Sequence, residues 1–518
     1  MQISLSIICL FALLNLFHLG EDAIEQNGVK YTKKQVLKDA IKIARSLKKL
    51  GLVSGDKIAI LTPNCYEGIV YNIAANAIGV STVFLNYADS VKSLAGTINF
   101  HGDIRFLVVR SDDMPRAVRI KLTCSELVVV KLGIIDADRA MQLTPNSNVS
   151  IWPTILKNAF SNKSRVFLQT SGSSGKSKDL PFSNRNIFAA LKYCSKSVDI
   201  KIRDKVFRSC LCIMPYRLPY GWGMIFVNLI GGQKVILATG AGADDTKNYY
   251  LCRPDVIYGT PTILRGMMDN TPEFADLSSV KVFFSGGFSV PDKWYKEGIE
   301  FFKNHGAADI QICNNYGFGE GLCIGTSSKD LPFMPNSVGR FFVGPEWRIV
   351  NECTLEKVSL GETGEIVVHA DSICDGYYKN PEATKKAFVT LDGKSFFRTR
   401  DLAYQDGHGN VFFKERAMRF YLPVGAPEKV YCSTISKLLD DLAFIGENVV
   451  VPVDGVSGVV YAVLRKNLAK NVDYEELTHE YLRSNLLPYQ VPTKVVFVDE
   501  IPYSSSGKVD YVKLQNLN

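Results

Sequence analysis

The sequence contains no cysteine pair separated by two residues and no histidine spacing of the kind that binds zinc. Its six histidines are scattered, and the closest cysteines, Cys210 and Cys212, lie in the apolar run CLCIMP. Free cysteines in apolar runs are usually buried. The sequence therefore predicts neither a zinc site nor a disulfide framework, and it predicts that these two thiols lie in a core.

Tracts of one charge sign are also absent. The 60 basic residues are interspersed with 52 acidic residues, which gives a formal net charge of +8 over 518 residues. Because nucleic-acid-binding proteins usually cluster their basic residues, this distribution does not favour nucleic acid as a partner. There is no internal repeat or low-complexity linker, and the length and 46% hydrophobic content predict a multidomain protein of enzyme size.

The apolar run at residues 3–17, ISLSIICLFALLNLF, is too short for a comfortable membrane span. Its length suits the core of a signal peptide, but no basic residue precedes it and no clear small-x-small cleavage site follows. We treat residues 1–24 as a hydrophobic leader with two interpretations. One is a signal or membrane anchor, through which the protein could associate with a membrane, and the other is a buried helix.

From residue 25 onward, short apolar runs alternate with helical patterns. Residues 32–51 open with the capping box Thr32-x-x-Gln35 and end at Gly51, which predicts an amphipathic helix. Continuous apolar strands separated by helices predict an α/β fold with mostly parallel sheets covered by helices on both faces. The predicted strands lie at 57–61, 81–85, 105–109, 126–130, 165–169, 234–237, 255–259 and 281–286.

The pattern changes near residue 340. The strand-like segments 347–350 and 364–371 and the hairpin signal DGHGNVFF at 406–413 predict a β-rich subdomain. After residue 416 an α+β pattern of its own follows, long enough for a small separate domain. We therefore expect a large domain over 25–416, which includes the β-rich subdomain, and a small α+β domain over 417–518.

The segment TSGSSGKSK, residues 170–178, follows a predicted strand and has the composition of a phosphate-binding loop. Hydroxyls, flexible backbone amides and lysines can surround phosphate oxygens. A Walker A motif requires a glycine where this chain has Thr170, so a P-loop site is excluded. A Gly-x-Ser-x-Gly elbow is absent, so a serine hydrolase would lack its nucleophile. From these residues alone, a flexible surface turn is an equally good interpretation.

This segment resembles the phosphate-binding loop of the adenylate-forming (AMP-binding) superfamily, which reads roughly T-S-G-T-T-G-x-P-K-G. Acyl-CoA synthetases, 4-coumarate–CoA ligases and beetle luciferases belong to that superfamily. The resemblance extends from about residue 25 to the C-terminus, and further motifs follow in the family's order. They are SGG (285–287), NNYGFGEG (314–321), SVGR (337–340), GETGEI (361–366), GYYKNPEAT (376–384), RTRDLAYQDGHGNVFFKER (398–416) and PYSSSGK (502–508).

The resemblance implies roles for residues of this chain. The residues implied to bind ATP are Thr170, Ser171, Gly172, Ser173, Ser174, Gly175, Lys178, Gly286, Gly287, Tyr316, Gly317, Asp401 and Arg416. Those implied to contact the acid substrate are Leu218, Gly221 and Phe318. Glu320 would hold Mg²⁺, and Lys508 would be the catalytic lysine that bridges the carboxylate and the α-phosphate. Each also has an ordinary structural interpretation, such as a simple ion pair between Asp401 and Arg416.

The resemblance implies a two-step reaction, in which a carboxylate attacks the α-phosphate of ATP and the CoA thiol then attacks the acyl-adenylate. We expect an ATP- and Mg²⁺-dependent acyl-CoA synthetase-like ligase whose small-molecule substrate is a hydrophobic carboxylic acid, such as a fatty or aryl acid. We expect the protein to be either cytoplasmic or membrane-associated with its site facing the cytosol. CoA is the less firmly supported cofactor. Two alternatives stay open: a family member that binds nucleotide or acyl ligand without turnover, and an enzyme that adenylates without transfer to CoA.

The chain departs from the family pattern within several motifs. Since the family's hinge and the loop after it reorient the small domain for the CoA step, departures there leave adenylation better supported than CoA transfer. Gly319 replaces a threonine, Leu218 replaces a histidine found in many members, Asp179, Arg400 and Glu415 replace glycines, and Tyr511 replaces an arginine. The hinge reads RAMRFYLPVG from Arg416 to Gly425, with Met418 and Leu422 at charged positions of the pattern.

Overall fold

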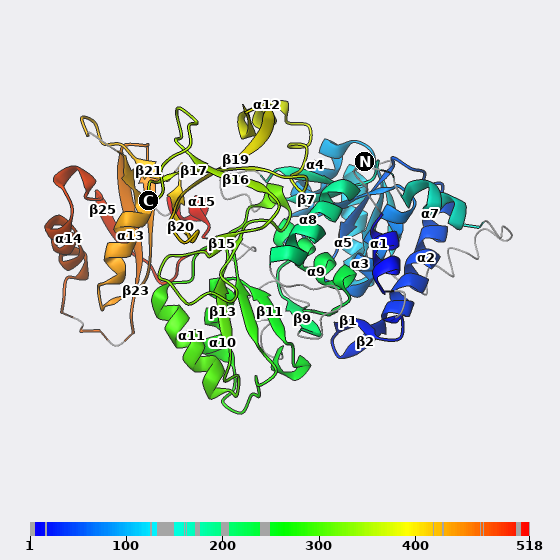
Figure 1. The fold of residues 1–518 in the computed structure, drawn as a ribbon, viewed down its shortest axis with the longest axis horizontal. Helices are drawn as coiled ribbons and strands as arrows, with labels where there is room; N and C mark the ends of the chain where they lie inside the picture. The colour runs from blue at the N-terminus through cyan, green and yellow to red at the C-terminus, as the bar shows by residue number, and fades with distance from the viewer. Residues whose placement is uncertain are drawn as a thin grey trace. The chain divides into compact units, whose positions relative to one another are not determined.

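The chain forms two compact units, whose helices and strands are drawn in Figure 1. The first comprises the described residues of Met1–Ser171, Ser177–Glu346 and His369–Phe397, and the second those of Trp347–Val368 and Arg398–Asn518. The computed structural model describes residues 6–15, 18–124, 127–131, 150–159, 161, 163–170, 177–197, 207–238, 249–417, 419–426, 429–466, 468–469, 471–503 and 509–516. The domain bounds 1–24, 25–416 and 417–518 stay predictions.

Two sheets form the framework of the first unit. One has the order β13 (Gln311–Asn314), β12 (Val282–Ser285), β11 (Val256–Gly259), β9 (Ser209–Cys212), β10 (Lys234–Leu237), β1 (Asp22–Gln26) and β2 (Val29–Thr32). The other has the order β6 (Val128–Lys131), β5 (Ile104–Val109), β3 (Lys57–Leu61), β4 (Ser81–Phe84), β7 (Arg165–Gln169) and β8 (Asp179–Ser183). All neighbours are parallel except β1–β2 and β7–β8, which confirms the predicted mostly parallel sheets.

Helices cover these sheets and bury the strands, because the strands are apolar on both faces. Every residue of β3 and β4 is buried, and the cores contain mostly aliphatic and aromatic side chains. The helices of the first unit are α1 (Ile7–Asn15), α2 (Lys33–Lys49), α3 (Tyr66–Ala77), α4 (Val91–His101), α5 (Met114–Thr123), α7 (Trp152–Ala159), α8 (Asn184–Ser197), α9 (Pro219–Gly231), α10 (Pro261–Asn270), α11 (Asp292–Asn304) and α12 (Pro381–Ala387). This unit also contains the strand pair β14 (Thr326–Ser327) and β15 (Arg340–Phe341) and the strand β18 (Phe388–Leu391).

The predicted helix at 32–51 is α2, and half of its capping box forms. The Thr32 hydroxyl accepts a hydrogen bond from the Gln35 backbone N–H at 3.2 Å. The Gln35 side chain donates to Asp39 at 2.8 Å instead of turning back to the cap. Gly51 follows the helix at φ +85°, a conformation that glycine adopts without strain.

The N-terminal apolar run contributes a buried helix to the first unit. Helix α1 packs against α9, α3 and α2 (Figure 1). Ile7, Ile8, Leu10 and Phe11 are buried, and the Asn15 side chain donates to the Ile230 carbonyl at 3.3 Å. Of the two interpretations of this segment, the structure shows the buried helix for Ile7–Asn15. Among the described residues, no helix is long and apolar enough to cross a membrane.

In the second unit, β16 (Glu346–Val350), β17 (Gly364–His369), β19 (Lys394–Gln405) and β20 (Val411–Arg416) lie in one sheet in that order. The turn between β19 and β20 is at the predicted hairpin signal, and the pairing is antiparallel. A hydrophobic core of this unit lies where helices pack on a three-stranded sheet. Its elements are β21 (Phe420–Tyr421), β22 (Val430–Tyr431), α13 (Cys432–Asp440), β23 (Ile445–Val453), β24 (Ser457–Leu464), α14 (Tyr474–Asn485), β25 (Lys494–Phe497) and α15 (Tyr511–Gln515).

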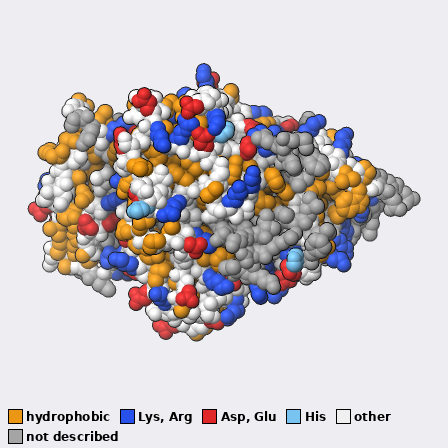
Figure 2. All heavy atoms as spheres, viewed as in Figure 1, with side chains coloured by type: hydrophobic (Ala, Val, Ile, Leu, Met, Phe, Trp, Pro, Cys, Tyr) orange, Lys and Arg blue, Asp and Glu red, His pale blue; other side chains and the backbone are white. Residues whose placement is uncertain are grey.

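The cysteines and the charged side chains are arranged as the sequence predicts. All twelve cysteines are free thiols, and Cys210 and Cys212 are buried as predicted. On the face drawn in Figure 2, basic and acidic side chains are interspersed over most of the described surface.

Candidate active site

Two of the predicted ATP-binding segments lie side by side at the carboxyl ends of parallel strands. Gly286 and Gly287 follow β12, and Tyr316 and Gly317 follow the neighbouring β13. The Gly286 N–H donates to the Gly259 carbonyl at 3.1 Å, and Gly287 has φ +98°. Ligands of open α/β sheets bind outside the carboxyl ends of strands, so this edge is the expected place for a nucleotide.

The segment after β13 is held by backbone contacts and by one aromatic stack. The Tyr316 N–H donates to the Thr326 hydroxyl at 3.1 Å, and Gly317 forms an antiparallel bridge with Gly325. The Phe318 ring stacks on Phe397 with centroids 5.3 Å apart. The structure therefore fixes Phe318 as part of an aromatic wall, and its role in binding the acid stays a prediction.

The phosphate-binding segment begins and ends in a closed neck. Strands β7 and β8 are antiparallel neighbours, with Gln169 opposite Asp179. The Lys178 N–H donates to the Thr170 hydroxyl at 2.9 Å, and the Thr170 N–H donates to the Lys178 carbonyl at 3.0 Å. These bonds close the neck of the β7–β8 pair at Thr170 and Lys178. Ser171, Gly172, Ser173, Ser174 and Gly175 lie outside the described residues.

Lys178 and Glu320 both contact Tyr377, a residue that the sequence analysis did not single out. The Lys178 ammonium lies 4.3 Å from the centroid of the Tyr377 ring, and the Tyr377 hydroxyl donates to Glu320 Oε1 at 2.6 Å. The Glu320 carbonyl accepts from the Cys374 N–H at 3.0 Å. The only signal for Tyr377 was its place in the motif GYYKNPEAT, which the sequence analysis treated as a connecting signature.

Glu320 fits a magnesium site that is completed by substrate. Among the described residues there is no group of three or more histidine, cysteine, aspartate or glutamate side chains that could hold a metal. Mg²⁺ is usually bound by one or two carboxylates together with substrate phosphates and water. Glu320 is a single carboxylate of the kind that Mg²⁺–ATP requires, and Tyr377 links it to Lys178. Metal binding by Glu320 and phosphate binding by Lys178 stay predictions.

The other predicted substrate residues have clear packing roles. Leu218 caps α9 and is buried in the core of the first sheet. A Cβ at Gly221 would lie 2.3 Å from the Pro215 carbonyl oxygen, so only glycine fits there. The neighbouring Arg217, which sequence reasoning missed, is buried, and its carbonyl accepts from the Gln169 N–H at 3.0 Å. Burial lowers the pKa of the Arg217 guanidinium.

Asp401 and Arg416 belong to the second unit, where they are directly opposite each other on β19 and β20. Arg416 Nε lies 3.0 Å from Asp401 Oδ1, and the carboxylate is buried while the guanidinium is partly exposed. The structure therefore shows the ion pair between Asp401 and Arg416. A role of these two residues at the ribose stays a prediction, as does that of Lys508, which lies outside the described residues.

Comparison with known proteins agrees with this geometry. The family model described as "AMP-binding enzyme" matches residues 17–378. The chain belongs to this family. A long-chain-fatty-acid–CoA ligase of Mycobacterium tuberculosis is 24% identical over 503 residues, which cover 93% of this chain and 92% of that protein.

Solved structures of AMP-binding enzymes share the fold over nearly the whole chain. ATP-bound MatB from Rhodopseudomonas palustris has a TM-score of 0.82 at 22% identity and covers 98% of both chains. The amide bond synthetase McbA from Marinactinospora thermotolerans has a TM-score of 0.77 at 22% identity and covers 99% of both chains. The predicted fold class is confirmed.

The departure from the AMP-binding pattern at Asp179 is compensated inside the first unit. The sequence suggested a negative charge beside the phosphate site, but the Asp179 side chain is only 8% exposed and lies 3.2 Å from Nε2 of the fully buried His101. Gln169 Nε2 donates to the other carboxylate oxygen at 3.4 Å. The Tyr378 ring stacks on His101 with centroids 4.8 Å apart. The backbone N–H of Tyr378 donates to the Asp179 carbonyl.

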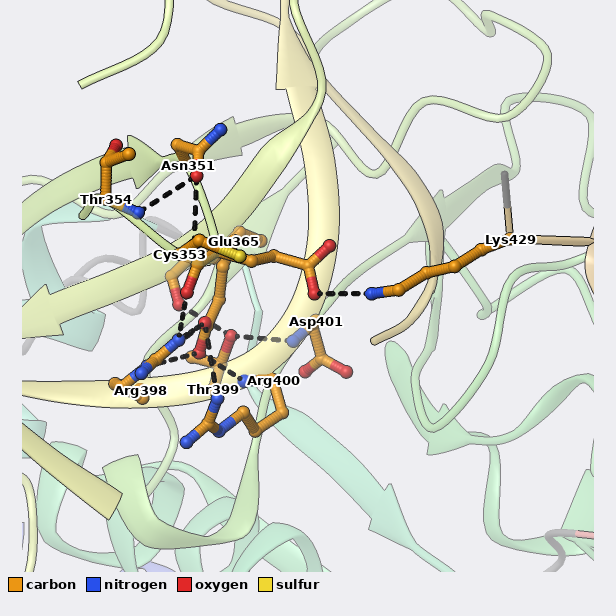
Figure 3. Close-up of polar contacts among 11 residues, drawn as sticks. Asn351, Cys353, Thr354, Glu365, Arg398, Thr399, Arg400, Asp401 and Lys429 are labelled. Carbon is orange, nitrogen blue, oxygen red and sulfur yellow. Dashed lines mark hydrogen bonds and ion pairs between the residues drawn. The ribbon is translucent and has the colours of Figure 1, made fainter. Parts of the chain in front are cut away.

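Arg400, where the AMP-binding pattern has glycine, adopts the left-handed conformation that glycine would provide. Its φ is +60°, which is costly for a residue with a Cβ. The Arg400 N–H donates to Oε1 of the buried Glu365 at 3.1 Å, and the Arg398 guanidinium also bonds this carboxylate. Figure 3 shows Arg398 and Arg400 beside Glu365, with the Asp401 carboxylate pointing away from Glu365.

Two further departures also have partners within the second unit. Glu415 is buried, accepts the Ser433 N–H at 2.7 Å, and does not have a positive φ, so no glycine is required there. Burial raises the pKa of the Glu415 carboxyl. Tyr511 receives the Arg419 guanidinium over its ring at 4.0 Å. Of the hinge positions, Met418 lies outside the described residues, whereas Leu422 is exposed.

Proposed function

We propose that this AMP-binding enzyme activates a hydrophobic carboxylic acid with ATP to an acyl-adenylate and then transfers the acyl group to CoA. The observation that carries the proposal is the contact of Lys178 and Glu320 through Tyr377. Through this contact the Lys178 ammonium and the Glu320 carboxylate, which is of a type that Mg²⁺ binds, lie on the same tyrosine. Both are needed where an anionic carboxylate approaches an anionic phosphate.

Each residue has a distinct task in this scheme. Lys178 and the amides and hydroxyls of the loop it closes would bind the leaving β- and γ-phosphates. Bound Mg²⁺ would supply charge neutralisation on the phosphate oxygens, held by Glu320. Lys508 would donate to both the attacking carboxylate and the α-phosphate as charge develops between them. Asp401 would accept hydrogen bonds from the ribose hydroxyls, and Arg416 would bind the ribose or a phosphate.

Apolar residues favour a hydrophobic acid. Leu218 stands where many members of the family have a histidine, and Phe318 is one ring of an aromatic stack. The similarity to a long-chain-fatty-acid–CoA ligase supports the same class of substrate. Fatty and aryl acids are therefore the first compounds to test.

Adenylation without CoA transfer is the second candidate. In the hinge segment 416–425, Met418 and Leu422 stand at charged positions of the family pattern, and Leu422 is exposed. An amide bond synthetase is among the proteins that share the fold. These observations concern the second half-reaction only, so the two candidates share the first half-reaction.

Carboxylate-dependent exchange of pyrophosphate into ATP tests the first half-reaction. We expect exchange with at least one acid of a panel of fatty and aryl acids. Lys508→Ala should abolish exchange while ATP binding, measured by calorimetry, is largely kept. Lys513→Ala, which removes an exposed lysine of α15, is the matched control and should exchange normally.

The outcomes separate the candidates. Nucleotide binding with no exchange across the panel would identify a binding protein without turnover and refute the proposal. Exchange without acyl-CoA formation, when CoA is added, would support the second candidate. Unchanged exchange in Lys508→Ala would remove Lys508 from its proposed role.

A further inference from the structure

The outward face of α2 carries a row of basic side chains. The helix has seven basic residues and one acidic residue, Asp39, which is buried and accepts hydrogen bonds from Gln35 and Tyr66. At 100° per residue, five of the basic residues fall within an arc of about 80°, over a length of about 22 Å. They are Lys34, Lys38, Lys42, Arg45 and Lys49.

Four of the five residues in this row have no acidic partner in the part of the chain that the structure describes. Lys34, Lys38, Arg45 and Lys49 form no ion pair with any residue that the structure describes. Because the basic residues are separated by three or four positions, the sequence shows no basic tract, and only the helix brings them onto one face. The potential of such a row extends over about one Debye length, roughly 10 Å at ~0.1 M salt.

Large apolar side chains are exposed at the C-terminal end of the row. Leu50 and Val53 follow α2 and are 40% and 63% exposed, and Trp152 and Leu156 on one face of α7 are 52% and 67% exposed. The turn after α2 and α7 are joined by the Ser54 hydroxyl, which donates to Asn158 Oδ1 at 3.2 Å. The Lys48 ammonium also donates to the Thr154 hydroxyl.

We call the basic row of α2 and the exposed apolar residues near its C-terminal end the α2–α7 surface. Figure 2 shows hydrophobic side chains gathered beside lysine and arginine side chains where α2 and α7 lie in Figure 1. The surface consists of Lys34, Lys38, Lys42, Arg45, Lys49, Leu50, Val53, Trp152 and Leu156.

We propose that the α2–α7 surface binds the surface of a membrane that contains anionic lipids. Stable peripheral binding requires two contributions, electrostatic attraction and apolar insertion, and this surface offers both side by side. A nucleic acid would match the basic row but not the exposed aliphatic side chains. Residues Ile7–Asn15 of the N-terminal run that first suggested an anchor form helix α1, which packs in the first unit, and the α2–α7 surface is a different part of the chain. The inference does not depend on the proposed reaction.

Sedimentation of the full-length protein with lipid vesicles tests the proposal. We expect binding to vesicles of phosphatidylcholine with phosphatidylserine and much weaker binding to vesicles of phosphatidylcholine alone, with binding reduced by salt. Each lysine near an anionic surface contributes about fivefold to partitioning. The variant Lys34→Gln/Lys38→Gln/Lys49→Gln should therefore bind about 100-fold more weakly. The matched control is Lys293→Gln/Lys296→Gln/Lys303→Gln on α11, a helix with interspersed acids, and it should bind like the wild type.

A second measurement tests the apolar part. Brominated lipids should quench the fluorescence of the wild-type protein, and Trp152→Phe should remove that quenching although three of the four tryptophans remain. Equal binding to both kinds of vesicle, or equal losses in the two triple variants, would overturn the proposal. Binding of an RNA homopolymer through the α2 lysines without vesicle binding would overturn it as well.

Discussion

His101 Nε2 lies 3.2 Å from Asp179 Oδ2, and both side chains are removed from water. The contact joins the end of α4 to the first residue of β8, immediately after the phosphate-loop neck closed by Lys178. The family pattern has a glycine at position 179, which could not form this contact. The buried His101 therefore accounts for how this chain accommodates an aspartate there. The Asp179 carboxylate thus has buried partners on α4 and β7 beside the neck.

Asp179→Ala should lower the free energy of unfolding by about 1–3 kcal/mol, because a buried donor or acceptor on His101 loses its partner. His101→Leu/Asp179→Ala removes both polar groups and should recover part of that loss. Urea unfolding of the wild type, both single variants and the double variant measures the coupling. Strictly additive losses would show that the two side chains do not interact.

Tyr377→Phe should raise the Mg²⁺ concentration needed for half-maximal pyrophosphate exchange by about tenfold, since side chains that support a metal ligand commonly contribute that much to metal affinity. The substitution removes the hydroxyl that donates to Glu320 and keeps the ring beneath Lys178. Titration of Mg²⁺ in the exchange assay and calorimetry of Mg²⁺–ATP binding give two readouts. Tyr377→Leu, which also removes the ring, should additionally raise the KM for ATP. An unchanged Mg²⁺ dependence in Tyr377→Phe would separate Glu320 from metal binding.

Arg400→Gly should be more stable than Arg400→Ala by about 1 kcal/mol, because only alanine keeps a Cβ in the left-handed conformation at φ +60°. Both variants lose the guanidinium and keep the N–H that donates to Glu365. Comparing them therefore isolates the backbone cost from the side-chain contact. Thermal or urea unfolding provides the measurement, and equal stability of the two variants would contradict the left-handed conformation.

Glu447 on β23 should make stability depend on pH. Burial raises the pKa of its carboxyl from the ordinary value of 4.5 to about 7. Folding is therefore penalised as pH rises from about 4.5, where the unfolded chain begins to ionise, to about 7, and the penalty is constant above that. Glu447→Gln should thus stabilise the protein by about 1–2 kcal/mol more at pH ~8 than at pH ~5, allowing for partial exposure. Unfolding of both proteins at the two pH values checks this, and a pH-independent difference would refute it.

Much of the framework could be predicted because it depends on local patterns. The strands at 57–61, 165–169 and 234–237 have the predicted bounds, since each contains a short apolar run that follows a basic residue. The cap at Thr32 followed in the same way from residues three positions apart. The N-terminal run was ambiguous, because a buried helix and a signal core have the same composition.

The sequence by itself determined the family, the order of the motifs and the parallel α/β architecture, because apolar periodicity and motif spacing are properties of neighbouring residues. Only the tertiary structure decided what the unusual residues do. Asp179 pairs with a histidine that is 78 positions away, and Tyr377 joins a lysine and a glutamate from two other segments. Such contacts arise when segments far apart in the sequence end at one edge of a sheet or pack against one helix. A local sequence pattern does not determine which distant side chain will be the partner.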